Sequence, residues 1–340
     1  MNRVMGVLSI AVVVACAWCA AARGNVVISR VMIGDPGNAA DPRYPNGGVP
    51  SFGAVDYIYS IGKYEVTAGQ YTQFLNRVGG VDTYGLYNPD MSDTSYGNGI
   101  TRSGGGTIGN PYTYSVALLF VNRPVGSVSF WDSCRFVNWL QNGQPAGAQG
   151  PGTTETGVYT LNGYTGTDGR TIQRNAGWTW ALPNEDEWYK AAYYKGGSTN
   201  AGYWDYPTSS NAQPGRDMAD VSGNNANYHG NSGPFPIDPP RYYTVVGEFQ
   251  NSDSPYGTFD QGGNVSEWSE TIYDDTLRRH RGGSAGDDAP AQLHAQGWAQ
   301  TTPSVEYCGI GFRVVQIPEP ATLGLLALGG IAIFQRRRHR

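Results

Sequence analysis

The sequence predicts an α+β fold with few helices, short antiparallel strands and long loops. Of its 340 residues, 48 are glycine and 23 are tyrosine, and only 15% are charged, which is typical of a chain that turns often and packs through aromatic rings. A hydrophobic content of 39% is enough to build a core, which excludes an intrinsically disordered protein. No internal repeat or linker divides residues 25–316, so we expect one domain there.

Three segments combine an N-terminal capping pattern with the spacing of an amphipathic helix. The expected helices, with their capping residues, lie within 65–78 (Thr67 and Gln70), 127–140 (Ser129 and Asp132) and 182–197 (Asn184). The third begins with Glu185, Asp186 and Glu187, which resemble a catalytic cluster. Acidic residues in a first turn complement the helix dipole, so we interpret them as structural. Two alternating runs, residues 56–64 and 241–249, predict short antiparallel strands.

The N-terminal residues 1–22 have the features of a secretory signal peptide. Arg3 precedes an apolar run at 4–15, and small residues lead to a cleavage position after Ala21 or Ala22. Residues 13–16 also fit a lipoprotein processing site, which is the alternative interpretation. Both interpretations predict that the chain is exported.

The C-terminal residues 317–340 combine a Pro-Glu-Pro sequence with a short apolar run and an arginine cluster. The run at 321–334 is shorter than the roughly 20 residues that span a membrane comfortably. The whole segment resembles the PEP-CTERM sorting signal of exported bacterial proteins. This resemblance implies cleavage near Ile317 by a membrane protease of the exosortase type, and membrane contact only through this anchor. We expect a location in the bacterial cell envelope, on the cell surface or in an extracellular matrix.

Net charge and cysteine content narrow the class of protein further. A formal net charge of -5 argues against nucleic acid as a partner, because phosphate binding needs clustered Lys and Arg. Between the two terminal segments, the cysteines are Cys134 and Cys308. In an oxidising compartment they could form one disulfide, or they could be buried thiols.

The stretch DQGGNVSEW, residues 260–268, places two carboxylates seven residues apart around two glycines and an asparagine. Calcium takes about six to eight oxygen ligands, and glycines let main-chain carbonyl groups converge on one ion. A simple turn satisfies the same pattern. Nothing in the stretch indicates the burial of one acid against the other that an acid/base pair needs. From these residues alone, calcium binding and a structural turn are both open.

Six segments, in this order, resemble the sulfatase-modifying-factor family, whose founding members are formylglycine-generating enzymes. The segments are IGKYEVTAGQYTQFLN, RPVGSVSFWDSCRFVNWL, LPNEDEWYKAA, GGNVSEW, RGGS and GIGFRV. The resemblance covers residues 55–316. It implies a variant of the C-type lectin fold with little regular secondary structure, in agreement with the composition.

The resemblance also implies two structural calcium sites. The ligands would be side chains and main-chain carbonyl groups of Asp260, Gly263, Val265 and Glu267 at the first site, and of Asn227, Tyr228, Asp238 and Pro240 at the second. Because six segments match in register, we favour calcium over a simple turn at the first site.

Enzymes of this family oxidise a substrate cysteine with a copper ion, which is held by two cysteines that follow the Gly-Gly-Ser motif. Counted from Ser284, these positions hold Asp287 and Gln292 here, and Gly309 stands where the enzymes place an asparagine. Thiolates suit Cu(I), whereas carboxylate and amide oxygens suit hard ions such as calcium. A lone Cys308 cannot replace two sulfurs. We therefore expect neither bound copper nor formylglycine-generating activity.

A related branch of the superfamily uses non-heme iron held by histidines. His280 and His294 could form such a site with Asp287 or Asp288. Together with His229, however, they show no paired metal-ligand spacing. An enzyme with altered oxidative, protein-modifying activity is therefore the alternative interpretation.

The favoured interpretation is a calcium-stabilised module that binds a ligand or acts as a scaffold. We expect a groove for a glycan or an exported peptide, because aromatic rings provide apolar contact and carboxylates orient hydroxyl groups. The residues expected to line it are Ser284, Asp287, Asp288, His294 and Trp298. Core packing of Trp298, and a purely structural protein of the surface or matrix, are the alternatives.

Overall fold

The structure, a computed structural model, describes residues 24–44, 52–96, 98–230, 233–274, 276–287 and 290–317. The expected signal peptide and the sorting segment beyond Ile317 therefore lie outside the described residues. Within the described ranges, no helix is both long and apolar enough to cross a membrane. Most of the described chain is loop, which confirms the predicted loop-rich α+β fold.

The helices are α1 (Ala68–Val78), α2 (Phe130–Gln141) and α3 (Glu185–Tyr193), with single 3-10 turns at Pro89–Ser92 and Pro290–Gln292. The strands are β1 (Arg30–Ile33), β2 (Tyr59–Gly62), β3 (Ile100–Ser103), β4 (Thr113–Val116), β5 (Trp180–Ala181), β6 (Ser266–Ile272), β7 (Arg278–Arg281), β8 (Ala299–Thr301), β9 (Ile310–Gly311) and β10 (Val315–Gln316).

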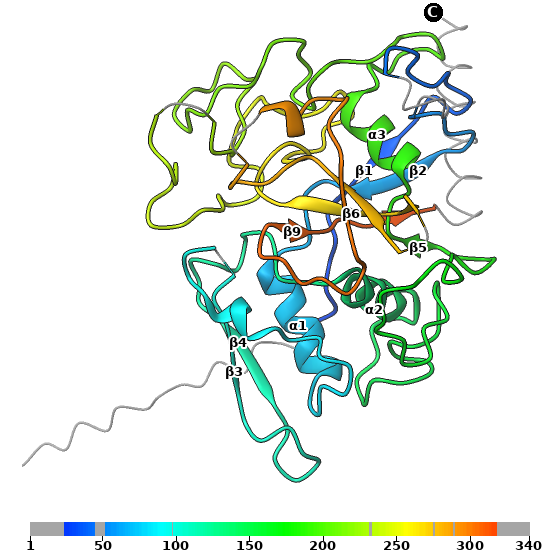
Figure 1. Ribbon diagram of the computed structural model, residues 1–340, viewed down its shortest axis with the longest axis vertical. Coiled ribbons are helices and arrows are strands. Elements are labelled where there is room, and N and C mark those ends of the chain that lie inside the picture. Colours follow the sequence, from blue (N-terminus) through cyan, green and yellow to red (C-terminus); the bar gives the residue numbers. More distant parts are fainter. Residues whose placement is uncertain are drawn as a thin grey trace, which may run out of the picture.

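These short strands form two four-stranded sheets and one separate ribbon (Figure 1). The first sheet has the order β1-β2-β10-β5 and is antiparallel throughout. The second has the order β8-β7-β6-β9, in which only β6 and β9 run parallel. Strands β3 and β4 form an antiparallel hairpin that extends away from the rest of the domain in Figure 1.

All three predicted helices are present, and each begins after its predicted capping residue. The Thr67 hydroxyl accepts from the amide of Gln70 (3.2 Å), and the Gln70 carboxamide accepts from the amide of Thr67 (2.9 Å). Reciprocal capping boxes start α2 at Ser129 and α3 at Asn184. Because these bonds satisfy helix-end amides from within the segment, local sequence sets where each helix begins.

The acidic residues at the start of α3 make structural contacts with other parts of the chain, in agreement with their interpretation as structural residues. Glu185 accepts from Arg279 Nη1 (2.8 Å) and Arg281 Nε (2.7 Å), which ties α3 to β7. Glu187 accepts from Arg174 Nη2 (2.6 Å). Asp186 accepts from the amide of Gly53 (2.8 Å). These contacts position the helix against three distant segments.

The prediction of a strand at residues 241–249 is wrong, whereas 56–64 contains β2 as predicted. The backbone amides of 241–249 bond to separate segments: Tyr242 donates to the Ser95 carbonyl (2.7 Å) and Val246 to the Asn122 carbonyl (2.9 Å). A ladder needs one neighbouring strand in continuous register. Alternating tyrosine and valine residues therefore pack here without forming a strand.

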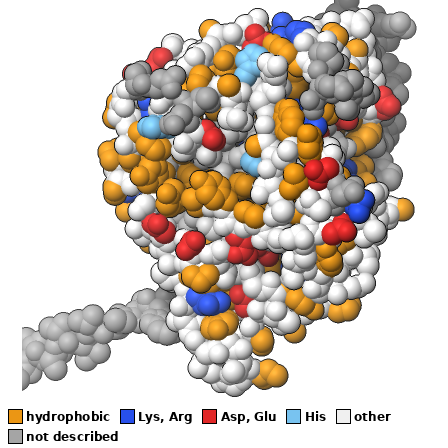
Figure 2. Space-filling view, viewed as in Figure 1, with side chains coloured by type: hydrophobic (Ala, Val, Ile, Leu, Met, Phe, Trp, Pro, Cys, Tyr) orange, Lys and Arg blue, Asp and Glu red, His pale blue; other side chains and the backbone are white. Residues whose placement is uncertain are grey.

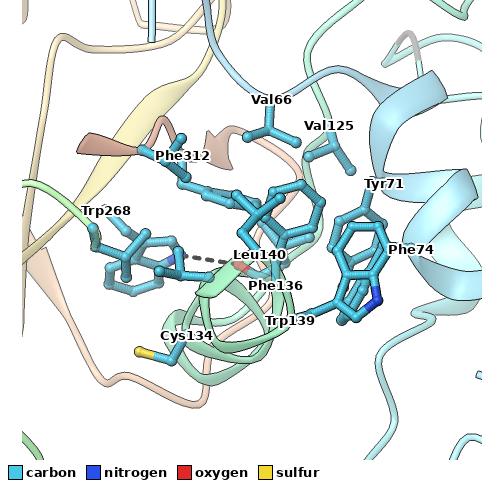
Figure 3. Packing of buried hydrophobic residues seen from close by; sticks show 14 of the residues in the cluster. Val66, Tyr71, Phe74, Val125, Cys134, Phe136, Trp139, Leu140, Trp268 and Phe312 are labelled. Atoms are coloured by element: carbon cyan, nitrogen blue, oxygen red, sulfur yellow. Dashed lines mark hydrogen bonds between the residues drawn. The ribbon is translucent and has the colours of Figure 1, made fainter. Parts of the chain in front are cut away.

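The main core lies where α1 and α2 pack against the segment that follows β9 (Figure 3). The Phe136 ring on α2 contacts Phe74 of α1 (centroids 5.3 Å apart) and Phe312 (5.4 Å). Phe74 also contacts Trp139 (5.2 Å). Cys134 is fully buried in this cluster, and burial raises the pKa of its thiol well above the usual value.

Arg313 joins the two sheets. It lies between β9, in the second sheet, and β10, in the first. Its guanidinium donates to Glu267 of β6 (2.5 and 2.6 Å) and to the carbonyl groups of Gly62 (2.9 Å) and Phe259 (2.9 Å). Glu267 also accepts from the Trp188 indole of α3 (2.7 Å). One buried ion pair thus fixes both sheets and a helix relative to one another.

A pair of carboxyl groups, one buried (Asp132) and one half-buried (Glu306), ties the loop before β9 to the start of α2. Glu306 is hydrogen bonded to Asp132 and accepts from the Asn88 amide. Asp132 also accepts from the Ser129 amide (2.9 Å). Burial and then the Asp132 charge raise the pKa of Glu306 to about 8, and burial raises the pKa of Asp132 to about 6. The two acids therefore share a proton at neutral pH.

We predict that Arg313→Met destabilises the fold by about 3–5 kcal/mol, because Glu267 would keep a buried charge without its cationic partner. Arg170→Met is the matched control: its pair with Asp168 is exposed, so the expected loss is about 0–1 kcal/mol. Urea unfolding measures both free energies. If Arg313→Met cost no more than the control, this ion pair would not be the joint between the sheets.

We also predict that Glu306→Gln flattens the loss of stability between about pH 5 and pH 8. The folded pKa is raised, so the stabilisation from Glu306 is complete below its ordinary value of 4.5 and is lost as pH rises through about 8. Glutamine keeps a donor for Asp132 but does not titrate, and the nearby charge of Asp82 is unchanged. Urea midpoints measured across this pH range should fall less steeply in the variant; parallel profiles would rule out the shared proton.

Candidate functional site

Two cavities, each of about 170 Å³, lie on opposite sides of β7. Neighbouring residues of a strand point to opposite faces. His280 faces one cavity, which we name the tyrosine cavity after its four tyrosines, Tyr96, Tyr242, Tyr243 and Tyr307. Arg281 faces the other, which we name the arginine cavity and which is also lined by Tyr44, Phe52, Tyr189 and Trp298.

The wall of the tyrosine cavity comes from loops rather than strands. The rings of Tyr96 and Tyr242 are stacked, with centroids 4.9 Å apart and an interplanar angle of 18°. Tyr243 is fully buried and donates its hydroxyl to the Cys308 carbonyl, while Tyr307 is 60% exposed at the rim. On the face drawn in Figure 2, hydrophobic side chains, tyrosines included, form a band with acidic side chains gathered beside it.

The floor of the tyrosine cavity is polar. Asp287 accepts from the amide (2.5 Å) and hydroxyl (3.0 Å) of Ser284, which closes the turn after the two glycines. His280 Nδ1 is hydrogen bonded to the Ser266 hydroxyl (2.6 Å). Burial lowers the pKa of His280 to about 4, so the ring is neutral at physiological pH. The floor thus offers hydroxyl groups, a neutral imidazole and one carboxylate.

The structure brings together the positions that correspond to the copper-binding cysteines of the enzymes. Asp287 and Gln292 both line the tyrosine cavity, with Ser284, Cys308 and Gly309. Burial, and to a smaller degree the charges of acidic residues outside the cavity, raise the pKa of the Cys308 thiol. The donors at these positions are therefore one carboxylate, one amide and one protonated thiol.

The candidate disulfide between Cys134 and Cys308 is not formed: both are free thiols. Cys134 faces the core from α2, whereas Cys308 lies in the tyrosine cavity. An even number of cysteines does not show whether they lie close together, because that depends on how the chain packs.

The structure does not bring the residues of the expected groove into one cavity, because they lie on both sides of β7. Ser284 and Asp287 line the tyrosine cavity, and Trp298 lines the arginine cavity. His294 packs between the rings of Tyr44 (5.3 Å) and Tyr206 (5.2 Å). Asp288 lies outside the described residues. The alternation of side chains along β7 separates residues that are close in sequence.

The geometry gives no support to an iron site. His280 is in the tyrosine cavity, His294 is on the other side of β7, and His229 contacts Phe235 (4.3 Å). In the described ranges, no three His, Cys, Asp or Glu side chains are arranged to hold a metal ion. The two histidines that would share the iron do not converge.

At the first expected calcium site, Arg313 and Trp188 already bond to the carboxylate of Glu267. The carboxyl group of Glu65, however, has no hydrogen-bond partner. Glu267 is committed to Arg313 and Trp188, as described above. Asp260 accepts from the Gly247 amide (2.5 Å), and both carboxyl oxygens of Glu65 are buried without any hydrogen-bond partner.

Glu65, Asp260 and Glu267 share a single buried guanidinium, so negative charge is in excess. Burial and then the Asp260 charge raise the pKa of Glu65 well above its usual value, and burial raises the pKa of Asp260 to about 6. Gly263 belongs to the same turn; a Cβ there would lie 2.2 Å from the Asn227 carbonyl oxygen, so only glycine fits. Glu65 and Asp260, unlike Glu267, make no hydrogen bond to a guanidinium group within the described residues. The sequence signal for Glu65 was an acid within the otherwise packed run KYEVT.

Arginines occupy the second expected calcium site. Asp238 accepts from Arg123 Nη2 (2.6 Å) and Arg241 Nη2 (3.3 Å). The Tyr228 carbonyl accepts from Arg216 Nε (2.6 Å). Oxygens already bonded to guanidinium groups do not fit a calcium ion, so these residues do not form the expected site.

Comparison with known proteins agrees with this architecture. Residues 54–317 match the family model described as "Sulfatase-modifying factor enzyme 1-like domain", and residues 316–338 match the PEP-CTERM protein-sorting motif. That motif indicates export in bacteria toward the cell envelope and recognition by exosortase-type processing. Among curated proteins, none matches the sequence.

Solved structures that are similar to this chain include the following three. Variable protein 1 of Treponema denticola is 18% identical with a TM-score of 0.51, covering 87% of this chain and 98% of its own. CarF is 21% identical with a TM-score of 0.48, covering 86% and 99%. PvdO from Pseudomonas aeruginosa is 18% identical with a TM-score of 0.43, covering 86% and 92%. At these identities, such likeness concerns the fold alone.

By the match over residues 54–317, the chain belongs to the sulfatase-modifying-factor family of formylglycine-generating-enzyme-type domains, and it carries a PEP-CTERM sorting signal.

Proposed function

We propose that this exported protein is a ligand-binding module of its family that does not generate formylglycine. The observation that carries the proposal is the pair Asp287 and Gln292 in the tyrosine cavity, at the positions where the enzymes hold copper between two cysteines. Hard oxygen donors favour other ions than Cu(I). Cys308 adds one thiol, and its raised pKa keeps that thiol protonated, which makes it a poor metal ligand.

The shape and lining of the tyrosine cavity support binding. Aromatic rings form one side, and hydroxyl groups, an imidazole and a carboxylate form the other, which is the usual composition of a small-ligand site. The floor is preorganised, since Ser284, Asp287, Ser266 and His280 are already held by hydrogen bonds to one another. Preorganised groups lose little conformational entropy when a ligand binds.

We also propose one structural cation, preferably calcium, between Glu65 and Asp260. Burial raises the pKa of both carboxyl groups, and a cation between them would favour their charged forms. A bound calcium ion would neutralise both carboxylates and stabilise the joint formed by Arg313, which carries a single positive charge. This role requires no catalytic step.

We predict that the wild-type protein leaves a cysteine-containing peptide unchanged when incubated with Cu(I) and oxygen. Mass spectrometry of the peptide detects conversion of the thiol to an aldehyde. A double variant, Asp287→Cys with Gln292→Cys, should retain one Cu(I) against a chelator that strips copper from the wild type, because thiolates suit this ion. Aldehyde formation by the wild type would contradict the proposed function.

We further predict that calcium raises the melting temperature of chelator-stripped protein by roughly 5–10 °C at about 100 times its Kd. Glu65→Gln should abolish this response, because it removes a ligand charge. Asp238→Asn is the matched control at the second expected site, and its calcium response should equal that of the wild type. Calcium binding should also release protons, which calorimetry in buffers of different ionisation enthalpy can measure. An unchanged melting temperature in wild-type protein would eliminate the ion.

A further inference from the structure

We propose that the tyrosine cavity recognises an organic cation, an ammonium or guanidinium head group held against the tyrosine rings. This inference rests on the proposed function and specifies its ligand class. It follows from three features of the described residues: ring geometry, the charges of the lining, and the way that the other cations of the molecule are used.

The rings provide faces and edges around one small space. Tyr96 is stacked on Tyr242 and lies at a tilted angle to Tyr243, with centroids 6.4 Å apart. Tyr307 is exposed at the rim. The faces of aromatic rings carry partial negative charge, so several rings around one space attract a cation.

Among the described residues, those that line the tyrosine cavity include no lysine or arginine. Its histidine, His280, is neutral for the reason given above. Asp287 contributes a carboxylate to the floor. The charges of the lining therefore favour a positive ligand and oppose an anionic one.

Acidic residues next to the cavity extend this negative field. Asp93 contributes to the raised pKa of Tyr96, Tyr243 and Cys308, and Asp90 contributes to that of Cys308, although burial or a neighbouring group is the larger cause in each case. These shifts have the same sign because carboxylates disfavour any further negative charge nearby. A cation entering the cavity would experience the opposite effect.

Elsewhere in the molecule, aromatic rings already form cation–π contacts with arginine side chains of the protein itself. Arg279 lies over Trp298 (4.5 Å from the centroid), and Arg281 lies over Phe52 (5.2 Å) and Tyr189 (5.1 Å) in the arginine cavity. Both arginines pair with Glu185, so two guanidinium groups share one carboxylate. No lysine or arginine of the described ranges stacks on a ring of the tyrosine cavity, which leaves these rings available to an external cation.

The size of the cavity limits the ligand. About 170 Å³ is less than the roughly 300–1,000 Å³ of a site for a drug-sized molecule, so the cavity accommodates one head group rather than a whole chain. The cation can come from a quaternary amine or from the side chain of a basic peptide. Both sources share the same chemistry, and the experiment separates them.

The test is calorimetric titration of the purified wild-type protein with choline, with Nα-acetyl-arginine amide, and with 3,3-dimethylbutan-1-ol, the neutral isostere of choline. At least one cation should bind, and choline should bind at least about five times more tightly than its isostere. The preferred cation identifies the source: choline indicates a quaternary amine and the arginine derivative a basic side chain.

Variants locate the binding. Tyr96→Leu and Tyr242→Leu should each weaken cation binding by roughly five- to thirtyfold, whereas Tyr96→Phe should keep it because the ring face is retained. Asp287→Asn should weaken binding of both cations without weakening that of the isostere. Tyr96→Phe also controls for folding of the variant at this position.

Two outcomes would overturn the inference: equal binding of choline and its isostere, or no cation binding at all. They are distinguishable from failure of the proposed function, because that failure is aldehyde formation on a cysteine peptide. A wild type that binds neutral sugars but no cations, and forms no aldehyde, would keep the proposed function and eliminate this inference.

Discussion

The buried pair between Arg313 and Glu267 is the interaction on which the remaining architecture depends. Each strand of this domain is too short to define a sheet alone, and Arg313 lies where the chain leaves the second sheet for the first. Glu267 and its neighbour Ser266 point to opposite faces of β6. The pair therefore fixes the core side of β6, and with it the hydroxyl that Ser266 presents to the tyrosine cavity.

Side chains of β7 also point alternately to opposite faces, so the two cavities beside this strand are lined by different residues. On one side, Arg279 and Arg281 lie over aromatic rings and share the single carboxylate of Glu185, so two guanidinium groups face one acidic group there. On the other side, His280 is neutral and no arginine is present among the lining residues. Two spaces of about equal volume, separated by a single strand, thus differ in the charged residues that line them.

The sequence predicted the features that depend on residues close together along the chain. The capping boxes at Thr67, Ser129 and Asn184 fixed the helix starts, because their hydrogen bonds join residues three positions apart. The residues that depend on distant partners were not predictable. Glu65 meets Asp260 only after folding, and the pairing of Asp238 with arginines rather than calcium needs Arg123, which is more than one hundred residues away.

The two changes at the positions of the copper-binding cysteines have an electrostatic consequence beyond the loss of sulfur. In the enzymes a metal ion lies between the two thiolates, whereas here Asp287 places a carboxylate in a cavity where none of the described lining residues is a lysine or arginine. A carboxylate in such a cavity attracts a cation. Ser284 donates two hydrogen bonds to Asp287, which hold this carboxylate in place on the floor. The residue that argues against thiol oxidation is thus also the carboxylate on which the proposed recognition of an organic cation depends.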